Sequence, residues 1–216
     1  MKDVIQFANK YKGRAFLIIG AGGTLDTHRC QIEKFIANKN PVVIGINNMT
    51  DIHIPDYHLW TNTKRYINFG NTISEKSIPI LSHKFSKKLI HKHWKKDFVK
   101  IFYTDCPKHK IKIEEKYIKG HFRTAGCLSI VMSHIFGSND INIVGMDGYT
   151  YIKGGDVQGQ HFYGTGMTDG EDWSVMKKKD DIVNRVLKNI NNFGIKFKIL
   201  TPTVFDKFYD AEVFGG

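Results

Sequence analysis

Short apolar runs separated by amphipathic stretches form the pattern of this chain. Continuous apolar runs of a few residues are typical of strands that are buried on both faces of a sheet. Strands are therefore predicted at 15–19, 41–46, 58–61, 78–81, 98–103, 141–145 and 195–200. Apolar positions that recur every three or four residues predict helices at 2–12, 84–96, 124–136 and 174–192, and a further helix between the first two strands.

The order of these elements predicts the fold class. A strand at 15–19, a glycine turn, a helix and a strand at 41–46 form a βαβ unit, whose two strands are expected to be parallel and buried. The continued alternation predicts an α/β protein with an open, mostly parallel, Rossmann-like sheet, helices on both faces and a small lid. The chain is interpreted as one domain over 1–216, with 84–119 and 153–172 as insertions.

The second insertion is too long and too polar for a structural turn. Residues 153–172 hold six glycines and the run His161-Phe162-Tyr163, a composition that fits a lid closing over a bound ligand. A fixed loop that is packed by its own aromatic side chains is the alternative. Within the first insertion, residues 104–120 show little periodicity and are expected to form a connection or flap.

Positive charge is concentrated in the first insertion. The formal net charge of the chain is +11, and Lys84–Lys119 holds 12 lysines against four acids, a net charge of +8. Such a concentration of positive charge could contact nucleic acid, an anionic membrane surface or a phosphorylated substrate, or could simply be a solvated face. Lysine far outnumbers arginine, which reads bases and phosphates better, so no nucleic-acid partner is expected. Contact with an anionic membrane surface stays open.

Several other classes of protein do not fit the sequence. No apolar run approaches the roughly 18 residues of a membrane-spanning helix, and the first residues do not resemble a signal peptide. The three cysteines form no Cys-x-x-Cys pair, so neither a zinc site nor a disulfide framework is expected. We expect a cytoplasmic protein, and a peripheral position at the inner membrane and a homo-oligomeric state stay open.

Polar or glycine-rich residues follow four of the predicted strands. In an open α/β sheet, ligands bind beyond the carboxyl ends of the strands, and glycines before a helix N-terminus favour phosphate. A nucleotide is therefore predicted with its phosphate over Gly20–Gly23 and its base and ribose toward the other strand ends. The candidate binding residues are Gly20, Gly22, Gly23, Asn47, Asn62, Thr124, Gly126 and Asp147. Tight-turn geometry and capping of strands or helices are the alternative roles of these residues.

The glycine turn matches neither the full dinucleotide fingerprint nor a Walker A loop. Asn47, an amide, stands where an NAD enzyme usually has a carboxylate, which argues against NAD. A lone Asp147 makes no metal site, so we expect no metal and metal-independent chemistry.

Catalytic candidates lie around the second insertion. Tyrosine hydroxyls can stabilise a leaving phosphate without a metal, which makes Tyr149 and Tyr163 candidates, with Tyr151 as the alternative to Tyr163. His161 is a candidate general base for an attacking hydroxyl. Ordinary packing of the tyrosines and a histidine without a catalytic role are the alternatives.

Several short segments, in order along most of the chain, resemble the small bacterial sialyltransferases that decorate lipooligosaccharide. The matching segments are Ile18–Leu25 at the glycine turn, Asn47 and Asn62 after two strands, Arg123-Thr124-Ala125-Gly126 at a helix start, Ile143–Tyr149 at a strand end, and Ile199–Pro202. The resemblance is strongest in the helix start and the strand that follows it.

The resemblance implies a metal-independent glycosyltransferase. Such an enzyme would take sialic acid or a related nonulosonate from a CMP-activated donor to a glycan hydroxyl in cell-surface polysaccharide biosynthesis, with no cofactor besides this donor. The asparagines and the helix start at Thr124 would hold cytidine and ribose, Tyr149 and a second tyrosine would bind the phosphate, and a histidine would deprotonate the acceptor.

The chain departs from the family at three positions. Gly22 stands at or beside a donor-binding asparagine of the family, Ala125 replaces a serine, and His161 is out of register with the family histidine. The same glycine turn and Gly-x-Asp pattern is also similar to motility-associated flagellin-glycosylating factors and to 6-hydroxymethylpterin diphosphokinases. A diphosphokinase-type nucleotide enzyme and a non-catalytic accessory module of another polysaccharide-biosynthesis enzyme therefore stay open as alternatives.

Overall fold

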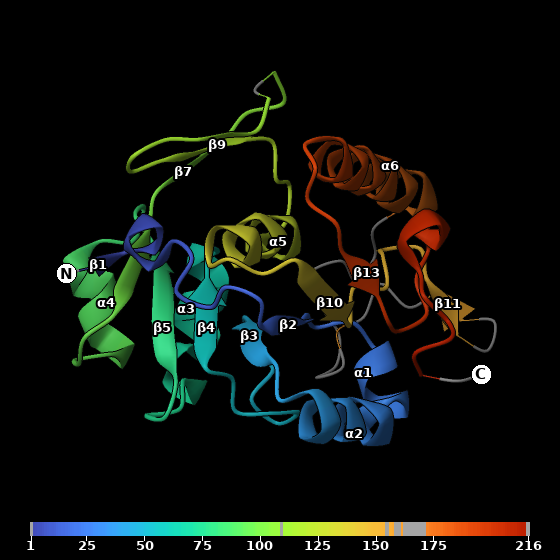
Figure 1. Cartoon of the computed structure of the whole chain (residues 1–216), viewed down its shortest axis with the longest axis horizontal. Coiled ribbons are helices and arrows are strands. Elements are labelled where there is room, and N and C mark those ends of the chain that lie inside the picture. Colours follow the sequence, from blue (N-terminus) through green and yellow to red (C-terminus); the bar gives the residue numbers. More distant parts are fainter. Residues whose placement is uncertain (1, 109, 154–155, 158–160, 162–171, 215–216) are drawn as a thin grey trace.

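A single parallel sheet forms the centre of the molecule (Figure 1). The structure, a computed structural model, describes residues 2–108, 110–153, 156–157, 161 and 172–214. The eight strands lie in the order β1 (Lys2–Asp3), β6 (Val99–Ile101), β5 (Ile78–Ser82), β4 (Tyr57–Trp60), β3 (Val42–Ile46), β2 (Ala15–Ile19), β10 (Asp140–Val144) and β13 (Lys198–Ile199). Every neighbouring pair is parallel, which confirms the predicted α/β class.

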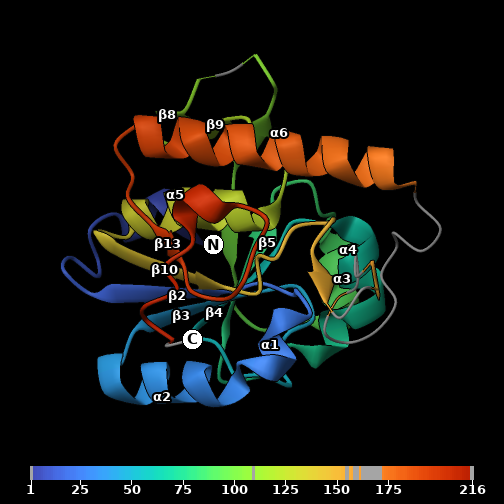
Figure 2. The same cartoon turned by 90° about the vertical axis from the view of Figure 1, so that its right-hand side faces the viewer.

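Helices cover both faces of this sheet (Figure 1, Figure 2). On one face lie α5 (Ala125–Ile135) and α6 (Trp173–Asn192), and on the other lie α1 (Thr24–Thr27) and α2 (Arg29–Lys39). The remaining helices are α3 (Thr63–Phe69), α4 (Lys87–His93) and the 3-10 turns η1 (Val4–Phe7), η2 (Gly70–Thr72) and η3 (Asp206–Phe208).

The side chains of β2 show how the sheet is buried on both faces. Phe16 and Ile18 belong to the core that includes α5 and α6, whereas Leu17 and Ile19 belong to the core beneath α1 and α2. Successive side chains of a strand point to opposite faces, so the unbroken apolar run Ala15–Ile19 supplies both cores at once. All four of these side chains are completely buried.

The chain reverses direction across the sheet between β2 and β10. From β2 it proceeds through β3, β4, β5 and β6 toward the edge formed by β1, while β10 and β13 lie on the other side of β2. Crossovers that leave in opposite directions open a crevice beyond the carboxyl ends of the two central strands, which is where ligands of open α/β sheets bind.

The two insertions are partly described. Residues of the predicted flap form a three-stranded sheet of β7 (Tyr103–Asp105), β9 (Ile118–Gly120) and β8 (Lys112–Ile113), which projects from the top of the molecule in Figure 1. The short pair β11 (Ile152–Lys153) and β12 (Asp156–Val157) begins the second insertion. Most of the predicted lid at 153–172 and Tyr163 lie outside the described residues.

The helix predicted at 2–12 is wrong. Lys2 and Asp3 pair with β6 as an edge strand, and Asp3 then caps the single 3-10 turn η1. Asn9 takes a left-handed conformation with φ of 58°, which ends any helical path. The strand predicted at 98–103 is also divided, because β6 joins the central sheet and β7 joins the small one.

In the part of the chain that the structure describes, we find no helix with the length and apolar character needed to cross a membrane.

Candidate functional site

A cleft of about 460 Å³ opens at the carboxyl ends of the central strands. Its walls come from the ends of β2, β3, β4 and β10, the start of α5, and α6. Nine of the sequence-predicted site residues line it, namely Gly20, Gly22, Asn47, Asn62, Thr124, Gly126, Asp147, Tyr149 and His161. Gly23 is the N-cap of α1 and is not part of the lining. The fold thus brings together residues from six separate segments.

The glycine turn after β2 packs directly on the turn after β10. The N–H groups of Gly20 and Gly22 donate to the carbonyl oxygens of Val144 and Gly145, at 2.8 and 2.9 Å. A Cβ atom on Gly20 would collide with the Gly145 carbonyl, and one on Gly22 would collide with the Asp147 carboxylate. The close approach of two chain segments therefore requires both glycines, and two N–H groups of the turn are already bonded within the protein.

Asp147 occupies the N-terminus of α1. Its carboxylate accepts hydrogen bonds from the Thr24 N–H, at 2.9 Å, and from the Thr24 hydroxyl. The side chain is 5% exposed, and burial raises the pKa of Asp147 to about 6, while the hydrogen bonds from Thr24 and the nearby His28 oppose that rise. Helix capping was one of the alternative roles of Asp147, and it accounts for these contacts. The capping also places an acidic group at the glycine turn, where the sequence predicts a phosphate.

Three cationic side chains also line the cleft. Arg65 of α3, Arg123 before α5 and Lys179 of α6 all line the cleft. The ammonium of Lys179 lies 5.1 Å from the centre of the Tyr149 ring. Burial raises the pKa of Tyr149, and the positive charges of Arg123 and Arg65 oppose this rise, so both arginines lie within electrostatic reach of the phenol.

Arg123 adopts an uncommon backbone conformation. Its φ is 58°, in the left-handed region that a residue with a large side chain enters only at an energetic cost. The Asp105 carboxylate accepts from the N–H groups of Phe122 and Arg123, at 2.9 and 3.5 Å, and so stabilises this bend. The bend places the guanidinium at the cleft immediately before α5 begins.

The N-terminus of α5 faces the same space. The Thr124 hydroxyl caps the helix by accepting from the Cys127 N–H at 3.2 Å. N–H groups in the first turn of a helix have no intrahelical partner, so those of Ala125 and Gly126 are available at the cleft wall. A Cβ atom on Gly126 would make only ordinary contacts, with Met146 at 3.5 Å, so packing does not require this glycine.

His161 uses both ring nitrogens within the protein. Its Nδ1 lies 3.1 Å from the Ala21 carbonyl oxygen, and its Nε2 lies 2.6 Å from Nη2 of Arg65. An arginine can only donate, so Nε2 accepts and Nδ1–H donates. Burial, reinforced by the charge of Arg65, lowers the pKa of His161 to about 4, although the bond to Ala21 raises it. The imidazole is thus neutral at physiological pH and holds Arg65 against the glycine turn.

The two asparagines differ in their surroundings. Asn62 is exposed, and its Oδ1 caps α3 by accepting from the Arg65 N–H at 3.1 Å. Asn47 has a left-handed backbone with φ of 55°, and its side-chain Oδ1 is buried without a hydrogen-bond partner among the described residues. A buried acceptor without a partner is costly, which makes Asn47, a residue of the cleft lining, a candidate for ligand contact.

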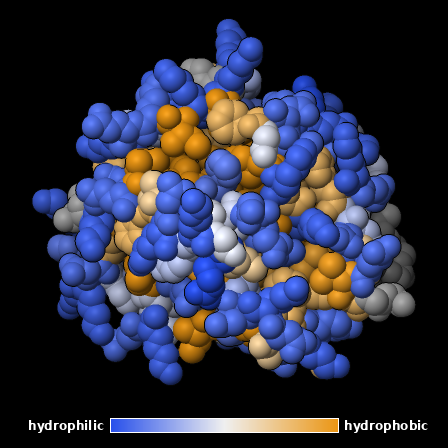
Figure 3. All heavy atoms as spheres, in the orientation of Figure 1, coloured by the Kyte–Doolittle hydropathy of each residue, from blue (hydrophilic) through white to orange (hydrophobic). Residues whose placement is uncertain are grey.

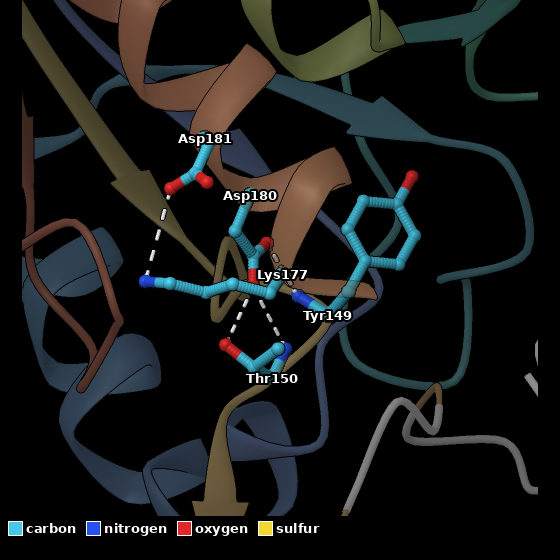
Figure 4. A network of polar contacts seen from close by, with 5 residues as sticks. All are labelled: Tyr149, Thr150, Lys177, Asp180 and Asp181. Carbon is cyan, nitrogen blue, oxygen red and sulfur yellow. Dashed lines mark hydrogen bonds and ion pairs between the residues drawn. The ribbon is translucent and has the colours of Figure 1, made fainter. Parts of the chain in front are cut away.

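A buried carboxylate of α6 fixes the segment that carries Tyr149 (Figure 4). Asp180 is 3% exposed and accepts from the N–H groups of Tyr149 and Thr150, both at 2.8 Å, and from the Thr150 hydroxyl at 2.7 Å. On the other side, the N–H of Val204 donates to the Asp147 carbonyl oxygen at 2.8 Å. These bonds set the position of the Tyr149 ring at the cleft.

Sequence reasoning missed the three cations. Arg65 follows the Asn62 cap by three residues, and Arg123 directly precedes the predicted helix start. Both arginines could therefore have been found from their proximity to candidate residues. Lys179 lies in a lysine-rich stretch of a long helix, and no sequence signal distinguishes it from its neighbours. Among the described residues we find no group of three or more His, Cys, Asp or Glu side chains that could hold a metal ion.

No protein-family model matches the chain, and a search of curated proteins finds no significant match.

Proposed function

We propose that this protein binds a nucleotide-activated sugar in the cleft and transfers the sugar, sialic acid or a related nonulosonate, from a CMP-activated donor to a glycan hydroxyl. The observation that carries the proposal is that one cleft contains the cationic side chains of Arg65, Arg123 and Lys179 together with Asn47, whose buried Oδ1 has no hydrogen-bond partner within the described part of the chain. A phosphorylated ligand with polar groups on its nucleoside satisfies both features.

The donor phosphate is assigned to Arg123 and the N-terminus of α5 rather than to the glycine turn. Asp147 would repel an anion at α1, whereas Arg123 and the N-terminus of α5 attract one. The nucleoside then extends toward Asn47 and Asn62, as the resemblance implies. The orientation within the cleft thus follows from the distribution of charge along its walls.

Transfer would replace one bond at the anomeric carbon of the sugar by another. The acceptor oxygen bonds to this carbon, the bond from the carbon to the phosphate oxygen breaks, and CMP leaves. Tyr149 retains its proton at neutral pH because its pKa is raised, so it can donate a hydrogen bond to the leaving phosphate. In this hypothesis Arg65 releases Nε2 of His161, and this nitrogen then takes the hydroxyl proton. Both this role and metal independence stay predictions.

A second candidate function is a nucleotide-binding accessory module without catalysis. One observation favours it, namely that both nitrogens of His161 are engaged and its pKa is lowered to about 4, which weakens it as a base. Binding of CMP without transfer to any glycan, in the presence of a CMP-activated sugar, would distinguish this candidate from the transferase.

Calorimetric titration with CMP, CDP, UDP, ATP with Mg²⁺, and NAD tests the proposal. We expect CMP or CDP to bind, and Arg123→Gly to weaken CMP binding by about tenfold or more, since a hydrogen bond to a charged group is lost. Glycine tolerates the left-handed φ of this position, so the backbone should be preserved. Arg185→Ala, on the exposed side of α6, is the control. Binding of ATP with Mg²⁺ alone would instead support a diphosphokinase-type enzyme.

The proposal extends to where the protein works. We assign it to the cytoplasmic side of an anionic membrane, with the projecting basic sheet of β7, β8 and β9 as the contact. Lys108, Lys110 and Lys112 are exposed there beside the exposed Ile113, a mixture of charge and apolar surface that suits a lipid headgroup layer. In Figure 3, hydrophilic side chains cover the top of the molecule and apolar ones gather below them.

A further inference from the structure

His161 and Arg65 are bonded to each other at the cleft. The backbone of His161 forms an isolated antiparallel bridge with Gly22, and Nδ1–H of its ring donates to the Ala21 carbonyl oxygen at 3.1 Å. On the other side of the ring, Nε2 accepts from Nη2 of Arg65 at 2.6 Å. The lone pair with which His161 would act as a base is therefore engaged by a guanidinium.

Arg65 also acts on the part of the cleft beside Tyr149. Its backbone N–H donates to Asn62 Oδ1 at 3.1 Å, which fixes the start of α3, whereas its guanidinium lines the cleft at the end of a long, rotatable side chain. The positive charges of Arg65 and Arg123 both lower the pKa of the Tyr149 phenol, although the two arginines come from different elements. An anion beside this phenol would therefore attract both guanidinium groups.

An anion is a stronger partner for this guanidinium than the imidazole is. The neutral ring of His161 offers Arg65 one acceptor atom, whereas a phosphate or sulfate group carries the opposite charge and offers two oxygens to the planar fork of the guanidinium. We infer that Arg65 moves from Nε2 of His161 to the anionic group of a ligand in the cleft, so that binding of this ligand releases the imidazole for proton transfer. The identity of the anion as a donor phosphate and of His161 as the base rest on the proposed function.

The exchange would change the basicity of His161 in a defined direction. Burial and the charge of Arg65 lower the pKa of His161 to about 4, and the bond to Ala21 opposes them. Departure of Arg65 removes one of these two causes and makes Nε2 available to a hydroxyl, while Nδ1–H stays on the Ala21 carbonyl and fixes the tautomer. Within the described part of the chain, the other ionisable side chains that line the cleft are Asp147, Tyr149, Arg123 and Lys179.

A base that becomes available after an anion has bound imposes an order on the reaction. The donor, which carries the phosphate, binds first, and an acceptor hydroxyl can then bond to Nε2 of His161. The exchange also predicts opposite effects of the two residues on the affinity for an anionic ligand. Arg65 contributes a bond to the ligand, whereas His161 competes with the ligand for Arg65.

The first measurement uses sulfate, an anion that does not titrate near neutral pH. The imidazole of His161 is titrated by NMR in chloride and in sulfate at equal ionic strength. We expect sulfate to raise the pKa of His161 in the wild type by about one pH unit or more. Arg65→Met should raise this pKa by a similar amount in chloride and leave little further response to sulfate.

Arg123→Gly is the matched control for loss of a cleft arginine. It should leave the pKa of His161 unchanged in chloride, because the imidazole is bonded to Arg65 and not to Arg123. An unchanged pKa of His161 in the wild type with sulfate, or in Arg65→Met without it, would overturn the exchange, whether or not the protein binds a nucleotide.

The second measurement is the dissociation constant of CMP by calorimetry. We expect Arg65→Met to weaken binding by about tenfold and His161→Phe to tighten it by about threefold or more, since the ring then no longer holds Arg65. The gain from His161→Phe should be absent when Arg65→Met is also present. Unchanged or weaker binding in His161→Phe, or a gain that persists in the double variant, would overturn the competition for Arg65. Failure of the wild type to bind CMP overturns the proposed function, while the sulfate titration still decides the exchange.

Discussion

Asp147 shows how one residue acquires its role from a distant segment. The carboxylate meets Thr24, 123 positions earlier in the chain, and takes the place at the start of α1 that an anion would otherwise occupy. Burial disfavours the charged form, which raises the pKa of Asp147 from 3.8 to about 6. A group whose pKa is raised on folding binds its proton more tightly in the folded state, so its effect on stability depends on pH.

The free energy of unfolding should therefore respond to Asp147 in a defined pH window. The stabilising contribution of the bound proton is complete below about pH 4 and is lost as the pH rises through about 6. Asp147→Asn, which is neutral at all pH values, should gain stability relative to the wild type by about 1 kcal/mol between pH 5 and pH 7. Urea denaturation at the two pH values measures this change.

A control separates this effect from the general titration of the protein. Asp181→Asn, at an exposed position of α6, should show no comparable change between pH 5 and pH 7. If Asp147→Asn and the wild type differ by the same amount at both pH values, the carboxyl titrates normally and the account of its burial is wrong.

At the scale of elements, α6 is the support for the loop after β10. Its apolar face packs in the core, and within that face Asp180 accepts three hydrogen bonds from Tyr149 and Thr150 (Figure 4). The next residue, Asp181, is exposed and pairs with Lys177 at 3.7 Å. Two adjacent carboxylates on one helix are thus expected to contribute very differently to the stability of the protein.

Asparagine substitutions at these two positions form a matched pair. Asp180→Asn turns one acceptor into a donor that faces backbone N–H groups, so we expect a loss of about 2–4 kcal/mol in the free energy of unfolding. Asp181→Asn should cost less than about 0.5 kcal/mol, since an exposed pair at this spacing contributes little. Denaturant titration of both variants tests this, and similar losses for the two would contradict the anchoring role of Asp180.

At the scale of the whole molecule, the cleft and the basic projection occupy different parts of the surface. The cleft lies at the carboxyl ends of the central strands, while the sheet of β7, β8 and β9 extends from the face that carries α5 (Figure 1). Within this sheet Glu114 pairs with Lys112 and Lys119, at 3.1 and 2.8 Å, so part of the positive charge is already neutralised. Lys108 and Lys110, at the exposed end of the projection, are the better candidates for an external anionic partner.

Vesicles containing phosphatidylglycerol test this surface. The protein should co-sediment with them and dissociate as salt rises, and Lys108→Glu with Lys110→Glu should weaken binding by about 30-fold or more, at about 1 kcal/mol for each lysine lost. Lys34→Glu with Lys39→Glu changes the net charge equally on the exposed side of α2 and is the control. Equal effects of the two double variants would show that net charge, and not the projection, governs binding.

The sequence by itself determined the parts of the fold that local patterns encode. The apolar run Ala15–Ile19 coincides with β2, and the amphipathic stretch from 174 to 192 coincides with α6 within one residue. Both patterns show which side chains of a segment are buried. The spacing of buried side chains is set by strand or helix geometry and is the same wherever the segment lies in the fold. Glycines and strand-end polar residues located most of the cleft for a similar reason, since the carboxyl ends of parallel strands lie along one edge.

Only the tertiary structure decided which distant side chains meet. Arg65, Arg123 and Lys179 come from α3, the start of α5 and α6, and no local pattern relates them. The same holds for the first residues, where pairing of Lys2 and Asp3 with β6 overrides the helical spacing of Val4, Phe7, Ala8 and Tyr11. It holds also for Asn47, whose carbonyl oxygen accepts from His58 on the next strand. The physical reason is that periodicity records how deeply a residue is buried, whereas charge clusters, caps and unpartnered acceptors depend on contacts between segments far apart in the sequence.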